Sequence, residues 1–410
     1  MMTVRYALLL LAARVCLGQT PAELLADSTV RAAMDAARRN EPGTLELQSR
    51  LCEIPAPPFQ EAVRGLELKR LFQELGLRDV RIDAAGNVIG VRPGKAARPN
   101  LVFAAHLDTV FPPGTNVKVT RQGATLKAPG IGDDCRGLAV MLAVIRALNE
   151  AQVETPGTIT FVADVGEEGL GDLRGMKSLF FDSLKGQIDK FISVDGTGLG
   201  ITHIGVGSNR YKVTFKGPGG HSYGAFGMAN PIQAMGRAIA KIDALEVPLQ
   251  PKTTFNVGRV GGGTSINAIP FEAWMEVDMR SSDPAVLKDL DTRFNAAIQQ
   301  AVAEENTRWN HRGPVSASAE LVGVRPAGET AKDSPIVQTA IAVSRAMRIE
   351  ESLHEGSTDS NVPMNLKIPA ITIGGGGAGT GAHSLNETFD STDSWRGTQR
   401  ALLLAIALAR

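Results

Sequence analysis

The feature that most constrains this chain is a series of apolar segments that each end in a histidine or an acidic residue. The four segments and the groups after them are 101–105 with His106, 158–165 with Glu167 and Glu168, 191–194 with Asp195, and 370–373 with a glycine-rich loop carrying His383. A fifth group, Asp133 and Asp134, precedes the apolar stretch 138–148. In an open α/β sheet, ligands bind beyond the carboxyl ends of the strands. We therefore expect these groups to converge on one site.

Strand and helix patterns alternate along the first half of the chain. Apolar spacing predicts helices at 62–75 and 138–148, and short apolar runs predict strands at 80–82, 88–91, 101–105, 158–163 and 191–194. Such alternation favours an α/β fold with a mainly parallel sheet covered by helices on both faces. A helix at 335–347, a strand at 370–373 and a helix at 392–408 are expected to return to this sheet.

The order of predicted elements changes between residues 208 and 325. A strand, helix, strand, strand, helix and strand are predicted at 211–215, 231–245, 253–260, 272–279, 284–305 and 316–322. This β-α-β-β-α-β order is that of a ferredoxin-like α+β unit with its own core. The predicted organisation is one domain in two parts, 19–207 and 326–410, interrupted by an inserted domain at 208–325.

The N-terminus has the layout of a secretory signal peptide. Arg5 precedes the apolar run 7–13, and small residues near Gly18 offer a cleavage point before Gln19. The run is too short to span a membrane, and an apolar N-terminal helix is the alternative. Residues 1–18 are therefore predicted to direct the chain to the periplasm or outside the cell. The mature chain would keep Cys52 and Cys135, expected as unpaired thiols, although an oxidising compartment would allow a disulfide.

The balance of charge argues against a nucleic-acid or membrane-surface partner. The chain has 43 basic and 43 acidic residues, and no long run of one sign occurs. Either partner would favour a basic face.

The acidic and imidazole groups have the chemistry of a metal site. Zinc-type catalytic ions take histidine nitrogen and carboxylate oxygen and leave a position open for water. A pair of ions about 3.5–4 Å apart needs a carboxylate that bridges them. Five residues supply one histidine and one terminal carboxylate per ion, with Asp133 shared: His106, Asp133, Glu168, Asp195 and His383.

The order of these groups resembles that of the M20 metallopeptidases. The resemblance is carried by five motifs: His106-x-Asp108, Gly132-Asp133-Asp134, Glu167-Glu168-Gly169, Asp195-Gly196 and His383. It covers roughly residues 46–410, and the five motifs in order are far more specific than one His-x-Asp pair. That family includes aminotripeptidases of the peptidase T type, glutamate carboxypeptidases and aminoacylases. The resemblance identifies the two-part domain as catalytic and the insertion as a lid and dimerisation domain.

The resemblance implies a role for each residue of the metal site. His106 and Asp195 would hold one ion, Glu168 and His383 the other, and Asp133 would bridge them. The ions would be zinc, with cobalt or manganese as alternatives.

The resemblance also implies two catalytic residues beside the ligands. Asp108 would accept a hydrogen bond from the second ring nitrogen of His106 and so fix its orientation. Glu167 would be the general base for the attacking water and would then protonate the leaving amine. The Asp133–Asp134 peptide bond would be cis.

Four further residues are implied to handle the substrate. His221 would reach the active site of a neighbouring subunit, which implies a homodimer. Asn267 and Arg280 would bind the main chain or carboxylate of the substrate, although Arg280 could equally be a surface residue of its strand. Asp359 lies in a segment that resembles one near the substrate pocket, with a plain turn as the alternative.

These roles predict a di-metal peptidase that cleaves amide bonds of small peptides. An aminopeptidase is favoured, because Asp359 at the mouth could bind a free α-amino group. The alternative within the family is a carboxypeptidase or an N-acyl-amino-acid deacylase, in which Arg280 would bind the terminal carboxylate. A non-catalytic, metal-dependent peptide-binding protein is a further alternative, which the presence of Asp108 and Glu167 disfavours.

Overall fold

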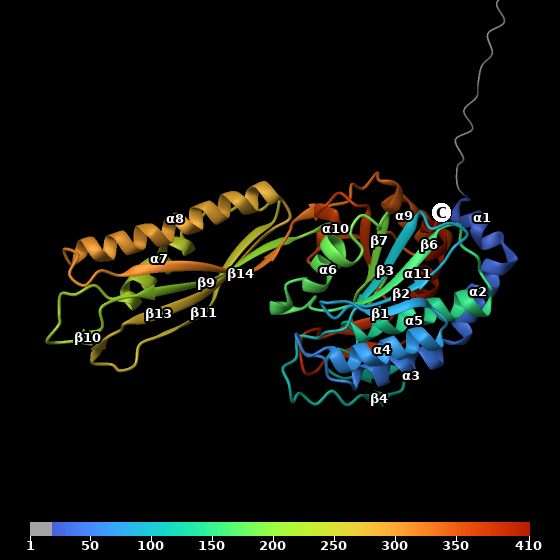
Figure 1. The fold of residues 1–410 in the computed structure, drawn as a ribbon, viewed down its shortest axis with the longest axis horizontal. Helices are drawn as coiled ribbons and strands as arrows, with labels where there is room; N and C mark the ends of the chain where they lie inside the picture. The colour runs from blue at the N-terminus through green and yellow to red at the C-terminus, as the bar shows by residue number, and fades with distance from the viewer. Residues whose placement is uncertain (1–18) are drawn as a thin grey trace, which may run out of the picture.

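The alternating elements of the sequence form a mixed central sheet in the computed structural model, which describes residues 19–410 (Figure 1). Eight strands of this described part follow the order β1 (Arg78–Ile82), β2 (Val88–Arg92), β6 (Thr158–Asp164), β3 (Asn100–His106), β7 (Lys190–Val194), β17 (Ala370–Ile373), β8 (Ile201–Gly205) and β15 (Gly328–Glu329). A ninth, β16 (Leu353–Gly356), pairs with β8. The central strands β6, β3, β7 and β17 are parallel to their neighbours within that group, as predicted.

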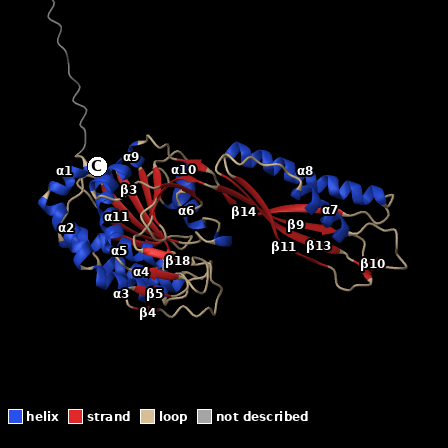
Figure 2. Ribbon diagram, turned by 180° about the vertical axis from the view of Figure 1, so that it is seen from behind, coloured by secondary structure: helices blue, strands red, loops and turns tan. Residues whose placement is uncertain are grey.

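Helices cover both faces of this sheet (Figure 2). The larger core includes α2 (Ser28–Arg39), α5 (Cys135–Glu150) and α11 (Trp395–Leu408), against which Leu101 and Phe103 of β3 pack. Val102 and Ala104 alternate to the other face, in the core that includes residues of α6 (Arg174–Ser178) and α10 (Asn361–Asn365). Both faces of β3 are thus buried, which explains its continuous apolar sequence.

Several smaller elements complete the catalytic domain. The remaining helices are α1 (Pro21–Ala26), α3 (Glu41–Cys52), α4 (Ala62–Glu74) and α9 (Pro335–Ala346). A small sheet has the order β18 (Ala378–Thr380), β19 (Thr388–Asp390), β5 (Thr125–Lys127) and β4 (Thr120–Gln122). It places the loop that carries His383 beside the segment that precedes Asp133.

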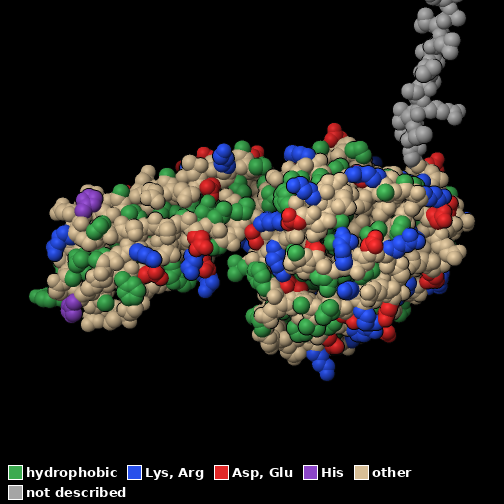
Figure 3. Space-filling view, viewed as in Figure 1, with side chains coloured by type: hydrophobic (Ala, Val, Ile, Leu, Met, Phe, Trp, Pro, Cys, Tyr) green, Lys and Arg blue, Asp and Glu red, His purple; other side chains and the backbone are tan. Residues whose placement is uncertain are grey.

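The insertion forms a second lobe with its own core (Figure 3). Its elements are β9 (Gly207–Lys216), α7 (Pro231–Asp243), β11 (Thr253–Gly262), β13 (Glu272–Ser281), α8 (Pro284–Arg308) and β14 (Ser316–Arg325). The antiparallel strand order β11-β13-β9-β14 is ferredoxin-like, as predicted. A short pair, β10 (Gly220–His221) with β12 (Ala268–Ile269), extends from the end of this lobe farthest from the catalytic domain (Figure 1).

The residues of strand β13 alternate between a face of the lid sheet that helices cover and a face that they leave open. Met275, Val277 and Met279 are buried in the core with α7 and α8. The alternate residues Asp278 and Arg280 are only partly buried, on the opposite face, which we call the open face. The lid sheet therefore presents a row of polar side chains away from its helices.

The predicted signal peptide, residues 1–18, lies outside the described residues. Within residues 19–410, no helix is both long and apolar enough to cross a membrane.

Candidate metal centre

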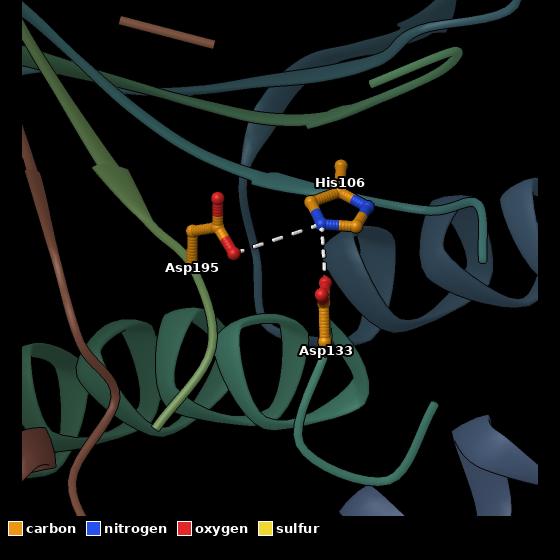
Figure 4. Close-up of side chains that lie close together, drawn as sticks. All are labelled: His106, Asp133 and Asp195. Atoms are coloured by element: carbon orange, nitrogen blue, oxygen red, sulfur yellow. Dashed lines mark hydrogen bonds and ion pairs between the residues drawn. The ribbon is translucent and has the colours of Figure 1, made fainter. Parts of the chain in front are cut away.

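Two strand ends and one turn bring the first set of predicted ligands together. His106 ends β3, Asp195 follows β7, and Asp133 lies in the turn before α5. Nε2 of His106 lies 3.0 Å from Oδ1 of Asp133 and 3.8 Å from Oδ1 of Asp195 (Figure 4). One potential ligand atom from each residue lies within 4.8 Å of the others.

A second set shares Asp133 with the first. Nε2 of His383 lies 3.1 Å from Oδ2 of Asp133 and 3.0 Å from Oε1 of Glu168. The potential ligand atoms of these three residues also lie within 4.8 Å of one another. The two oxygens of Asp133 thus face different histidines, which is the arrangement that a bridging carboxylate requires.

The electrostatics of the site favour bound positive charge. Burial opposes ionisation of His106, but the neighbouring carboxylates of Asp108, Asp133 and Asp195 raise its pKa well above the usual range. Hydrogen bonds to Asp133 and Glu168 raise the pKa of His383 to about 10. In the absence of ions, protons on the two histidines would balance the carboxylates. A pair of divalent cations would supply that positive charge instead, so the donor set fits two metal ions.

Asp108 is fully buried and holds the loop that follows β6. Its carboxylate accepts hydrogen bonds from the backbone N–H groups of Gly166, Glu167 and Glu168, at 3.0, 3.1 and 2.8 Å. Nδ1 of His106 lies 3.0 Å from the backbone carbonyl oxygen of Asp108 but 3.7 Å from its carboxylate. The closer contact of this ring nitrogen is therefore with the carbonyl oxygen, and the expected carboxylate lies farther from it.

Asp134 connects the turn to two strands. Its side chain accepts hydrogen bonds from the backbone N–H groups of Gly137, His106 and Gly196. The first of these caps α5. The Asp133–Asp134 peptide bond is cis, as the resemblance implies.

Glu387, which the sequence did not indicate, holds the turn that presents Asp133. Its carboxylate accepts hydrogen bonds from the backbone N–H groups of Gly130, Gly132 and Asp133, at 2.8, 2.8 and 3.1 Å. Glu387 is only 2% exposed. The sequence offered one signal for this role, which is that Glu387 lies four residues after the predicted ligand His383. The loop that supplies this ligand therefore also supports Asp133.

Glu167 lies beside the ligands and is paired with Arg325, a second residue that the sequence did not indicate. Nη1 of Arg325 donates to Oε1 of Glu167 at 2.9 Å, and Nη2 donates to the carbonyl oxygen of Glu167. Burial raises the pKa of Glu167 to about 8, although the charge of Arg325 opposes this rise. Atoms of Glu167, Glu168 and His106 also lie within 4.8 Å of one another.

A cavity of 430 Å³ opens over these groups. Asp133, Glu167, Glu168, Asp195 and His383 line it on the catalytic side. Three arginines complete the lining: Arg210 and Arg280 from the open face of the lid, and Arg325 from the end of β14. The cavity therefore combines the metal ligands with three guanidinium groups.

The structure separates the four residues predicted to handle the substrate. Arg280 lines the cavity. His221 and Asn267 are exposed on the β10–β12 extension and do not line it. Asp359 is fully buried rather than at the mouth, so it cannot reach a substrate amino group in this conformation. The reason is that segment 357–361 packs inward, with Asn361 hydrogen-bonded to the carbonyl groups of Val206 and Pro326.

Comparison with known proteins places these features in a family. A model of peptidase family M20/M25/M40 matches residues 102–407. The uncharacterized protein YqjE of Bacillus subtilis (strain 168) is 27% identical over 355 residues, which cover 82% of this chain and 90% of YqjE. Carboxypeptidase G2 of Pseudomonas sp. (strain RS-16) is 25% identical over 277 residues, covering 63% of this chain and 65% of that enzyme.

The fold is also similar to that of a solved structure. The crystal structure of aminopeptidase PepT from Bacillus cereus ATCC 10987 superposes with a TM-score of 0.72, at 22% sequence identity. The match covers 90% of this chain and 98% of PepT. The family match extends from the third residue of β3 almost to the C-terminus and includes all five predicted ligands. The chain therefore belongs to peptidase family M20/M25/M40, as the order of its motifs predicted, and is a metal-dependent amide hydrolase of that family.

Proposed function

We propose that this chain is a di-metal exopeptidase or deacylase that cleaves the amide bond next to a free carboxylate in small peptides or N-acyl amino acids. The proposal rests on the cavity of the metal site. In it, the two ligand sets that share Asp133 lie across from Arg210, Arg280 and Arg325.

The ligand roles follow from the two overlapping sets. His106 and Asp195 would hold one ion, Glu168 and His383 the other, with Asp133 between them. When bound, two divalent ions, which we propose to be zinc, would polarise the substrate carbonyl and lower the pKa of the attacking water.

Glu167 is proposed as the general base. Arg325 binds its Oε1, which leaves Oε2 for proton transfer in the cavity. A pKa of about 8 lies near neutrality, where a carboxylate can both accept a proton from water and return it to the leaving amine. Asp108 would act on this step by fixing the backbone of residues 166–168.

The charges of the cavity support carboxylate recognition over the amino-group recognition that the sequence favoured. Asp359 would have been the partner of an amino group, and it is buried. Guanidinium groups are matched to carboxylates by charge and by paired N–H donors. The carboxypeptidase among the relatives is consistent with this choice.

The test compares one dipeptide in three forms: both ends free, N-acetylated and C-amidated. We expect hydrolysis of the first two and loss of hydrolysis on amidation, with activity abolished by a chelator and restored by zinc. Cleavage of the amidated form together with refusal of the acetylated form would instead establish an aminopeptidase. Binding of all three without hydrolysis would identify a metal-dependent peptide-binding protein.

We also propose that the enzyme works as a homodimer in which His221 and Asn267 complete the partner's active site. Both are exposed at the far end of the lid, away from their own cavity. Large apolar side chains are exposed in the same region, including Tyr223 at 89% and Ile266 at 103%. Exposed apolar surface of this kind is typical of contacts with another chain.

Two further proposals are based on the sequence alone. The domain division 19–207, 208–325 and 326–410 is the organisation that we propose. Residues 1–18 are proposed to direct export to the periplasm or outside the cell. The mass of protein recovered from the producing cells would establish whether the mature chain starts at Gln19.

A further inference from the structure

A second cavity lies next to the metal-site cavity, between the catalytic domain and the open face of the lid. Its volume is 390 Å³, and most of its wall surface is apolar, although the polar residues Asn256, Arg259 and Glu276 also line it. Leu170 lies on the catalytic side and Val322 on the lid side. Arg210 lines both cavities, so the two spaces adjoin along its side chain.

Leu170 is placed over this cavity by the turn that follows the metal ligand Glu168. It belongs to the short 3₁₀ turn Gly169–Gly171 and is 67% exposed. The lid holds this turn at two points: Arg210 donates to the carbonyl of Gly169, and the N–H of Val324 donates to Asp172 at 2.8 Å. An apolar side chain is therefore fixed in an exposed position directly beside the metal site.

Charged groups mark the boundary between the two cavities. Nε of Arg210 donates to Oδ1 of Asp278 at 3.1 Å, and Nε of Arg280 donates to Oδ2 of the same carboxylate at 2.7 Å. One carboxylate thus serves two guanidinium groups, which leaves net positive charge at the boundary. The remaining N–H donors of both arginines are available to a substrate carboxylate in the metal-site cavity.

We propose that the cavity under Leu170 is a specificity subsite. It receives a large apolar side chain from the residue whose free carboxylate is bound by Arg210 and Arg280. Three observations select this occupant: the walls are mostly apolar, the space adjoins the metal site through Arg210, and the neighbouring charges suit a carboxylate. The preferred substrates are then N-acyl amino acids or dipeptides that end in leucine, methionine or phenylalanine. This assignment rests on the proposed function.

The test uses two substrates that differ only in this side chain, N-acetyl-leucine and N-acetylglycine. Wild-type enzyme loaded with zinc is expected to prefer N-acetyl-leucine in kcat/KM by about tenfold or more, the usual scale for a buried apolar group. Leu170→Ser and, independently, Val322→Ser are expected to reduce that ratio at least about threefold, because only the larger side chain reaches these residues. Leu66→Ser is the matched control, since Leu66 is 59% exposed on α4 and lines neither cavity.

Two outcomes would overturn the subsite. The first is an unchanged ratio in both Leu170→Ser and Val322→Ser, whether or not the two substrates lose activity equally. The second is a selective effect on Leu-Gly relative to Gly-Gly instead, which would assign the cavity to the residue on the amino side of the bond. Failure of the wild type to hydrolyse either N-acetyl substrate, with hydrolysis of a C-amidated peptide, would contradict the proposed function itself.

Discussion

Among single residues, Glu167 carries the most specific mechanistic prediction. Glu167→Gln keeps the size of the side chain and its contact with Arg325 but removes the base. Turnover is expected to fall by at least ~10²-fold, the scale of general acid–base loss. Metal content, measured by elemental analysis, is expected to stay at about two ions per chain, as the shared Asp133 implies. Survival of activity with the ions bound would place the base elsewhere.

Glu387 is predicted to act on metal affinity through Asp133. Glu387→Gln replaces one acceptor oxygen by an NH₂ group, which cannot accept a hydrogen bond from the backbone N–H groups of the turn. Loss of such support to a ligand typically weakens metal binding about 10- to 100-fold. Competition with a chromophoric chelator would measure the change. Equal affinities in variant and wild type would show that the turn holds its position without Glu387.

The buried acids Asp164 and Asp359 give a prediction about pH. Both are fully buried, and no hydrogen-bond donor reaches either carboxyl group within the described residues. Burial raises the pKa of Asp164 to about 7, and the charge of Asp108 adds to this rise. The folded state then binds more protons than the unfolded state between pH ~4 and ~7, so this group lowers stability as pH rises through that window.

Asp164→Asn removes that dependence. Relative to the wild type, the metal-free variant is expected to gain on the order of 2 kcal/mol of unfolding free energy between pH 5 and pH 8. Urea unfolding at the two pH values measures it. A constant difference between variant and wild type would show that Asp164 does not titrate in this range.

At the scale of elements, a buried ion pair joins three helices. Arg136 of α5 donates to Glu41 of α3 at 2.9 Å and to the carbonyl oxygen of Ser394 before α11. Glu41→Gln leaves a buried guanidinium without a carboxylate, which is expected to cost about 3–5 kcal/mol. The melting temperature should fall by several degrees. Glu150→Gln, which breaks the exposed pair with Arg39, is the control and should leave it nearly unchanged.

The sequence predicted the long elements better than the short ones. Continuous apolar runs such as 101–105 and the helical spacing of 284–305 were sufficient to predict a strand and a helix. In both, the spacing of the apolar side chains shows which residues are buried. The short strands β18, β19, β4 and β5 carry little apolar pattern and depend on pairing between distant segments. Asp359 was expected at the mouth of the cavity and is buried instead, although Ser357 of the same loop lines the cavity. Hydrogen bonds from Asn361 to the carbonyl groups of Val206 and Pro326 turn the loop inward, and a loop rich in polar residues does not predict them.

The same limit applies within the candidate site. The ligands were found because they follow apolar strands in a fixed order. Arg325 was missed because it stands at the predicted boundary of the insertion, and its partner Glu167 lies 158 positions away in the sequence. The role of Asp108 was only partly predicted. Its carboxylate accepts hydrogen bonds from three backbone N–H groups, and the sequence does not indicate such partners because nearly every residue type has the same N–H group.

At the scale of the whole molecule, the proposed dimer predicts complementation. A His221→Ala chain and a Glu167→Gln chain are each expected to be inactive. In a random mixture, half of the dimers are mixed, and each mixed dimer has one intact site, so about a quarter of wild-type activity should return. Light scattering would establish that both parents are dimers. Absence of recovery in folded mixed dimers would confine His221 to its own subunit or to a structural role.

The closeness of the two ends of the lid has a consequence for how the chain folds. Ser208 near the start of β9 pairs with Arg325 at the end of β14, so the folded lid begins and ends at one place. Strand β17 must join β7 after the whole insertion has been synthesised. Closing a disordered loop of roughly a hundred residues would cost about 4 kcal/mol in chain entropy. If the lid folds first, its two ends already lie together, and only a few residues remain to be closed into a loop. Folding of the insertion therefore lowers the entropy cost of pairing β17 with β7.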